Sequence, residues 1–129
     1  MTLDYLPRLP QDRSPGIGCI GAGFIMADCQ LPAYRAAGFR PLAIAARDQQ
    51  KVAEVAGRHN IQNVYADYRA VLDDPAVEVL DIAVPPDVQI EVIREAVQRK
   101  GKLRGILAQK PLGMNLAEAR EAVALCEAA

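Results

Sequence analysis

Residues 16–26 of this 129-residue chain read Gly16-Ile17-Gly18-Cys19-Ile20-Gly21-Ala22-Gly23-Phe24-Ile25-Met26. The short apolar run at residues 17–20 is typical of a strand, and Gly21 follows it directly. A glycine in that place permits a tight turn into a helix, and Gly23 two positions later lets a phosphate group approach the backbone. The segment therefore predicts a strand, a glycine turn and a helix whose N-terminus faces a bound dinucleotide.

Two registers of this glycine fingerprint are possible, one starting at Gly16 and one at Gly21. The second is favoured, because Ser14-Pro15 cannot form the strand that must precede the first glycine. Met26 stands where a glycine or alanine normally lets the helix pack closely on the strand, which predicts looser packing or a helix start shifted toward Pro32. The expected cofactor contacts in this loop are Gly21, Ala22, Gly23, Phe24 and Ile25.

The rest of the chain alternates short apolar runs with amphipathic segments, which predicts an α/β fold. Further strands are expected at residues 41–46, 64–65, 77–84 and 106–109, and helices at 25–37, 48–58, 68–72, 86–101 and 116–128. The predicted architecture is a doubly wound parallel sheet, the Rossmann fold, with five to six strands and helices on both faces. The expected order 3-2-1-4-5 places a ligand-binding switch point between the first and fourth strands.

Composition and charge restrict the class of protein. Apolar residues make up 51% of the chain and the formal net charge is −1, which fits one globular domain at residues 16–129 behind an N-terminal arm at residues 1–15. No cluster of charge or apolar N-terminal run indicates a nucleic acid or membrane partner. The cysteines Cys19, Cys29 and Cys126 match no metal-ligand spacing, so we expect reduced thiols, no metal and a cytoplasmic location.

Two side-chain placements follow from helix patterns. His59 follows Arg58 at the end of the predicted helix 48–58, where a cation complements the helix dipole, so a surface position is expected. The last helix is expected to turn four residues toward the core: Leu116, Ala119, Val123 and Cys126.

Five short motifs carry a resemblance to a known family, and they are distributed over nearly the whole chain from Gly16. They are Gly21-Ala22-Gly23-Phe24-Ile25, Leu31-Pro32-Ala33-Tyr34, Ala45-Ala46-Arg47-Asp48, Val84-Pro85-Pro86-Asp87 and Gln109-Lys110-Pro111-Leu112. With them the chain resembles the N-terminal domain of the Gfo/Idh/MocA oxidoreductases, named after glucose-fructose oxidoreductase and inositol dehydrogenase. Two positions depart from the family pattern: Gln109 replaces the glutamate of a Glu-Lys-Pro triplet, and Gln89 replaces a frequent histidine.

The resemblance implies hydride transfer between NAD(P) and a sugar-like or cyclitol substrate. It implies that Lys110 is catalytic and that the substrate site lies in a C-terminal domain that is absent here. The full-length enzyme is expected to be a homo-oligomer, and this chain alone is expected to be inactive. The further cofactor contacts that it implies are Ala46, Arg47, Val84, Pro85, Pro86, Gln89, Gln109 and Lys110.

The cofactor preference and the class of protein leave alternatives open. Arg47 ends the second strand where an acidic residue would bind the ribose of NAD, so NADP is favoured over NAD, unless Arg47 is a surface residue that pairs with Asp48. A free-standing nucleotide-binding or redox-sensing module without catalysis is the alternative function. A scaffold that binds a protein partner without nucleotide would leave the glycines and Lys110 unexplained.

Overall fold

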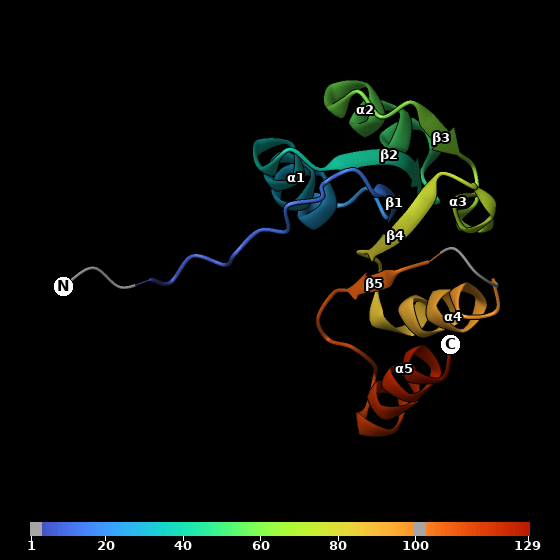
Figure 1. The fold of residues 1–129 in the computed structure, drawn as a ribbon. Coiled ribbons are helices and arrows are strands. Elements are labelled where there is room, and N and C mark those ends of the chain that lie inside the picture. Colours follow the sequence, from blue (N-terminus) through green and yellow to red (C-terminus); the bar gives the residue numbers. More distant parts are fainter. Residues whose placement is uncertain (1–3, 100–102) are drawn as a thin grey trace.

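Five parallel strands form one sheet in the computed structural model, which describes residues 4–99 and 103–129 (Figure 1). The strands are β1 (Gly16–Ile20), β2 (Arg40–Ala45), β3 (Asn63–Tyr65), β4 (Val77–Ile82) and β5 (Gly105–Ala108). Their order is β3-β2-β1-β4-β5, and every neighbouring pair is parallel. The predicted fold class and strand order are therefore confirmed.

The helices lie close to their predicted positions. They are the π-helical turn η1 (Ile25–Gln30) and the α-helices α1 (Leu31–Ala37), α2 (Gln49–His59), α3 (Tyr68–Asp73), α4 (Pro86–Ala96) and α5 (Leu116–Ala128). The expected end of α4 at Gly101 lies outside the described residues, and α4 itself ends at Ala96. No helix in the described part of the chain is both long enough and apolar enough to cross a membrane.

The helix after the glycine loop is irregular, as Met26 and Pro32 led us to expect. Its first six residues form a π-helical turn, and regular α-helix begins only at Leu31 with Pro32 in the first turn of α1. Proline has no N–H for an intrahelical hydrogen bond, so it is tolerated only near a helix start. Gly38 ends α1 with φ 78°, a left-handed conformation that favours glycine.

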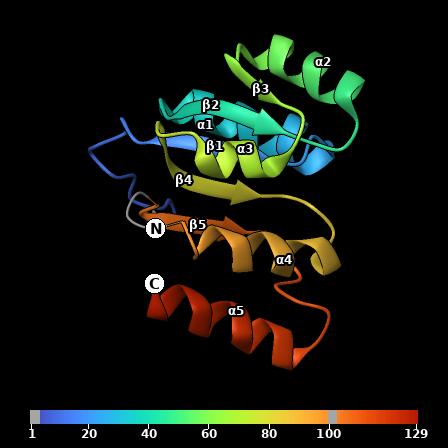
Figure 2. The ribbon, with the colours of Figure 1, turned by 90° about the vertical axis from the view of Figure 1, so that its right-hand side faces the viewer.

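Two apolar clusters pack on the opposite faces of the sheet. On one face α3 and α4 pack against the sheet with Val71, Ile90 and Ile93, and α5 adds Ala122. On the other face the helical segments η1, α1 and α2 contribute Met26, Leu31 and Val52 among others. Figure 2 shows the arrowheads of the strands pointing the same way, so their carboxyl ends meet at one edge of the sheet.

The predicted inward face of α5 is wrong. Its one fully buried residue is Ala122, whereas Leu116 is 65% exposed, Val123 is 48% exposed and Cys126 is exposed. The reason is that α5 packs beside α4, while β5 forms the edge of the sheet and Leu107 on it is 50% exposed. The face of a helix that is buried therefore depends on its neighbours as well as on its own pattern.

The surface position expected for His59 is also wrong. Its side chain is buried at the end of α2, and Nε2 lies 2.7 Å from the carbonyl oxygen of Ala27 in η1. The neighbouring Arg58 donates to the same carbonyl at 3.2 Å and pairs with Asp28 at 2.9 Å. The end of α2 is thus attached to the helical turn that follows the glycine loop.

The N-terminal segment is exposed, and Figure 1 shows it running away from the sheet. It is attached near its end, where the Arg13 guanidinium donates to the carbonyl of Ala37 at 2.6 Å and Arg40 donates to the carbonyl of Ser14 at 3.1 Å. All three cysteines are free, and Cys19 on β1 is the buried one.

We predict that His59→Ala lowers the free energy of unfolding by about 2 kcal/mol, because it leaves a cavity and removes a hydrogen bond from the Ala27 carbonyl. Urea denaturation of the purified chain measures this difference. Glu54→Ala, on the exposed face of the same helix, serves as the control and should change the stability by less than about 0.5 kcal/mol. Equal effects of the two substitutions would contradict the structural role of His59.

Candidate dinucleotide site

A cleft of about 560 Å³ lies at the carboxyl ends of β1, β2 and β4. This is the edge of the sheet where ligands bind in doubly wound folds, beside the switch point between β1 and β4. Its walls come from the loops after four strands. The lining residues are Ile20, Gly21, Ala22, Gly23, Ala45, Ala46, Arg47, Asp48, Lys51, Ala66, Asp67, Tyr68, Arg69, Ala83, Val84, Pro85, Val88 and Glu91.

The glycine loop forms the floor of the cleft, and its two glycines have different surroundings. Gly21 has φ +109°, and a Cβ there would collide with the carbonyl oxygen of Ala83. Its N–H donates to the carbonyl of Ala45 at 2.8 Å, so the turn is joined to the end of β2. A Cβ on Gly23 would meet nothing within 4 Å, which leaves open space beside the backbone where a phosphate group fits.

The loop after β2 and the first turn of α2 bring two cations to the cleft. Arg47 and Lys51 both line it, and in the described residues neither side chain makes a hydrogen bond or an ion pair. Asp48 is engaged as the N-cap of α2, because its carboxylate accepts the N–H of Lys51 at 3.0 Å. The alternative pairing of Arg47 with Asp48 is therefore not formed in this structure.

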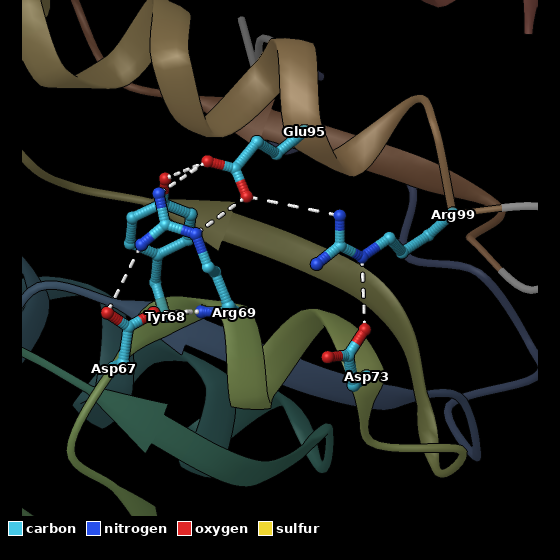
Figure 3. Close-up of polar contacts among 6 residues, drawn as sticks. All are labelled: Asp67, Tyr68, Arg69, Asp73, Glu95 and Arg99. Atoms are coloured by element: carbon cyan, nitrogen blue, oxygen red, sulfur yellow. Dashed lines mark hydrogen bonds and ion pairs between the residues drawn. The ribbon is translucent and has the colours of Figure 1, made fainter.

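A polar network closes the wall formed by α3 (Figure 3). The Arg69 guanidinium donates to both carboxylate oxygens of Glu95 on α4, at 2.7 and 2.9 Å, and it lies 4.7 Å from the ring centre of Tyr68. The Tyr68 hydroxyl donates to Glu95 at 2.6 Å. Burial and this hydrogen bond raise the pKa of Tyr68 to about 12, and hydrogen bonds from Tyr68 and Arg69 lower the pKa of Glu95.

Asp67, the acidic residue of the same wall, also has hydrogen-bond partners. Asp67 caps α3 by accepting the N–H of Arg69 at 2.7 Å, and its other carboxylate oxygen pairs with the Arg69 guanidinium at 3.3 Å. At the far end of α3, Asp73 pairs with Arg99, which lies just beyond the end of α4, at 3.0 Å (Figure 3). The charged side chains of α3 thus have partners of opposite charge, since Arg69 pairs with Asp67 and Glu95 and Asp73 pairs with Arg99. Arg47 and Lys51 have no such partner among the described residues.

A buried carboxylate attaches the helix after the glycine loop to β4. Asp81 is fully buried and accepts hydrogen bonds from the Tyr34 hydroxyl at 2.5 Å and the Gln30 amide at 3.0 Å. Burial raises the pKa of Asp81, although both hydrogen bonds oppose the shift. The strand that leads into Val84 and Pro85 is therefore attached directly to the helical segment that begins beside Gly23.

The residues after β5 lie beside the cleft rather than in its lining. The N–H of Gln109 donates to the carbonyl of Ile82 at 3.0 Å, which places Gln109 next to Ala83 in the cleft wall. Lys110 follows and is exposed. The side chain of Gln89 is fully buried and donates to carbonyl oxygens of residues 109, 111 and 112.

The structure thus brings together some of the predicted contacts. Among the expected residues the cleft is lined by Gly21, Ala22, Gly23, Ala46, Arg47, Val84 and Pro85, whereas Phe24, Ile25, Pro86, Gln89, Gln109 and Lys110 lie outside the lining. Phe24 is 68% exposed. Sequence reasoning missed Lys51 and the wall at residues 67–69, although the rule that sites gather at strand ends would have found this wall after β3.

The fold agrees with comparisons with known proteins. The family model of the "Oxidoreductase family, NAD-binding Rossmann fold" (GFO_IDH_MocA) matches residues 16–129. The chain belongs to this family. It is a dinucleotide-binding Rossmann domain of the oxidoreductase type, as the sequence motifs indicated.

The chain is similar to a curated dehydrogenase and to solved structures that hold either NAD⁺ or NADP. A trans-1,2-dihydrobenzene-1,2-diol dehydrogenase of Xenopus tropicalis is 36% identical over 107 residues, which are 83% of this chain and 31% of the relative. An oxidoreductase from Agrobacterium radiobacter, in complex with NAD⁺, L-tartaric acid and magnesium, matches with TM-score 0.80 and 27% identity over 89% of this chain and 33% of that one.

A 3-ketoreductase from Actinomadura kijaniata, in complex with TDP-benzene and NADP, matches with TM-score 0.77 and 25% identity. The match covers 88% of this chain and 35% of the ketoreductase. The chain therefore spans about a third of the length of the proteins that it matches. Both solved structures hold a dinucleotide, NAD⁺ in one and NADP in the other.

In the described residues of this chain, no three metal-ligating side chains lie close enough together to hold a metal ion.

We predict that Gly23→Val abolishes dinucleotide binding in a folded domain, because the branched side chain fills the open space beside the loop. Gly21→Val should destabilise the fold itself, by about 1–3 kcal/mol from its backbone conformation alone and further through the collision with Ala83. Calorimetric titration with NADPH and thermal unfolding separate the two effects. Gly57→Val, at a glycine that also lacks neighbours within 4 Å, is the matched control and should bind normally. Unchanged binding by Gly23→Val would show that the register is wrong.

Proposed function

We propose that this domain binds NADP(H) in preference to NAD(H) and forms the cofactor wall of an oxidoreductase acting on a ring-borne secondary alcohol. The observation that carries the proposal is the cleft itself, with open space at Gly23 on its floor and, at its β2 end, two cations whose side chains have no partner among the described residues. The helix after the glycine loop directs free N–H groups toward phosphate, as helix N-termini generally do. The bound nicotinamide ring supplies or accepts the hydride of the reaction.

The preference for NADP rests on the charges near the end of β2. The ribose of the adenosine half lies at this strand end in Rossmann domains, where an acidic residue selects NAD and an arginine accommodates the 2′-phosphate of NADP. Asp48 and Asp67 are both occupied as helix caps, which leaves Arg47 and Lys51 free to bind an anion. An arginine binds phosphate through two parallel hydrogen bonds, and Lys51 adds a second positive charge.

We predict that Arg47→Ala and Lys51→Ala each weaken NADPH binding by about one to two orders of magnitude, because a charge-assisted hydrogen bond contributes about 1.5–3 kcal/mol. Binding of NADH should change by less than about twofold, since it lacks the 2′-phosphate. Fluorescence titrations with both cofactors measure the two affinities. Arg120→Ala, at an exposed arginine of α5 away from the cleft, is the control. Equal loss of NADH and NADPH affinity in Arg47→Ala would contradict the assignment.

Lys110 is the residue that we propose as the proton-transfer group. It follows β5 on the side of β4 opposite to the adenosine half, and this is where the nicotinamide half of a dinucleotide lies. An exposed lysine at that edge has three donors with which to bind a substrate hydroxyl. The substrate class follows the named relatives and the sequence motifs: sugars, cyclitols and the trans-diol of the dehydrogenase share a secondary alcohol on a ring.

The domain forms only one wall of such a site. Hydride transfer needs the alcohol carbon held against the nicotinamide, and orientation of this kind contributes on the order of 7–11 kcal/mol. The relatives are about three times as long as this chain, and we propose that the additional length includes the substrate wall. A module that binds nucleotide without catalysis is the alternative. The homo-oligomer and the cytoplasmic location expected from the sequence stay predictions.

We predict that the 129-residue chain binds NADPH but shows no turnover with sugars or polyols, and that a full-length protein carrying it does. In that protein Lys110→Ala should lower kcat by about 10²–10⁴-fold, with little change in cofactor affinity, as expected for loss of a general acid–base group. Absorbance of the reduced cofactor follows the reaction across a panel of substrates. Turnover by the chain alone contradicts the one-wall account, and a full-length protein that binds NADPH without any turnover favours the alternative.

A further inference from the structure

The buried side-chain amide of Gln89 forms hydrogen bonds to several backbone carbonyls of the segment after β5. Gln89, in the first turn of α4, is fully buried, and its Nε2 lies 2.8 Å from the carbonyl oxygen of Gln109, 3.1 Å from that of Pro111 and 3.3 Å from that of Leu112. Three acceptors around one nitrogen identify it as the amide NH₂ group. The segment that carries Lys110 is therefore bonded on both sides of the lysine to one side chain.

This segment has little regular backbone bonding of its own. Residues 109–115 form neither helix nor strand, and Pro111 has no N–H to donate. The described hydrogen bonds at its start join Gln109 to the carbonyl of Ile82 and the N–H of Lys110 to the Gln109 side chain. The bonds from Gln89 are thus the main restraint on the carbonyl groups near Lys110.

The side-chain oxygen of Gln89 shows that the amide is present for its N–H donors and not for its acceptor. Its Oε1 atom is buried and lacks a hydrogen-bond partner in the described part of the molecule. A buried unpaired acceptor is unfavourable, and an apolar side chain of equal length would fill the space without it. Only a hydrogen-bond donor at this position can attach the carbonyl groups of residues 109–112 to α4.

The same residue also contacts the wall of the cleft. The backbone N–H of Gln89 donates to the carbonyl of Pro85 at 3.0 Å, and Pro85 lines the cleft. Gln89 therefore connects the cofactor wall after β4 with the loop after β5 through one residue.

We infer that Gln89 is a positioning residue, which fixes the loop at residues 109–112 against the nicotinamide half of the bound cofactor. The inference rests on the proposed function, because it takes the β5 side of the cleft as the nicotinamide side. It replaces the direct cofactor contact expected for Gln89 from the sequence. The adenosine half lies toward β2 and does not depend on this loop.

The test compares two ligands on the 129-residue chain: NADPH, and 2′-phospho-ADP-ribose, which lacks the nicotinamide ring. Gln89→Met keeps the length of the side chain and removes its donors, and we expect it to weaken NADPH binding about tenfold while 2′-phospho-ADP-ribose stays within about twofold. Gln89→His, which retains a ring N–H, should lie between Gln89→Met and the natural chain. If Gln89→Met does not fold, Gln89→Asn serves in its place, because the shorter amide cannot reach all three carbonyls.

Val92→Ala is the matched control, because it removes buried volume from the same helix and leaves the hydrogen bonds from Gln89 to the loop in place. It should lower thermal stability and leave the ratio of the two affinities unchanged. Equal loss of both ligands in the Gln89 variants, or no loss of either, overturns the inference while the proposed function stands. Failure of the natural chain to bind NADPH overturns both.

Discussion

The close approach of β1 and β4 at Gly21 is the constraint on which the rest of this domain depends. The chain leaves β1 at φ +109°, and the carbonyl of Ala83 occupies the position that any Cβ would need. Because the turn is this tight, Gly23 opens on the cleft and the helix after it starts beside the switch point. Two further contacts fix the same geometry: Asp81 accepts hydrogen bonds from Gln30 and Tyr34 of that helical segment, and the N–H of Gly21 donates to the end of β2.

Much of this arrangement was predictable, because the signals are local. A glycine after an apolar run, Asp48 before a helix and Gly38 after one each specify a backbone conformation through their own chemistry. The strand order follows from the right-handed crossovers of alternating strands and helices. Pro32 likewise marked the irregular helix after the loop, since it removes one hydrogen-bond donor.

The errors concern residues whose position depends on distant partners. His59 is buried because η1 offers it a carbonyl, and Val123 on α5 is exposed because α5 packs on α4 at the edge of the sheet. The same holds for the site: the wall at Tyr68 depends on Glu95 from another helix, and Gln89 contacts a loop twenty residues away. No periodicity within one segment contains that information.

Binding of a dinucleotide at the sheet edge between β1 and β4 can be followed through the amide chemical shifts of the isotope-labelled chain. On addition of NADPH we expect saturable shifts at Gly21 and Gly23, near Arg47 and Lys51 after β2, and at Val84 after β4. Amides on the outer face of α5, around Val123, should not move. Shifts concentrated on α5, or no saturable shift at the glycine loop, would contradict it.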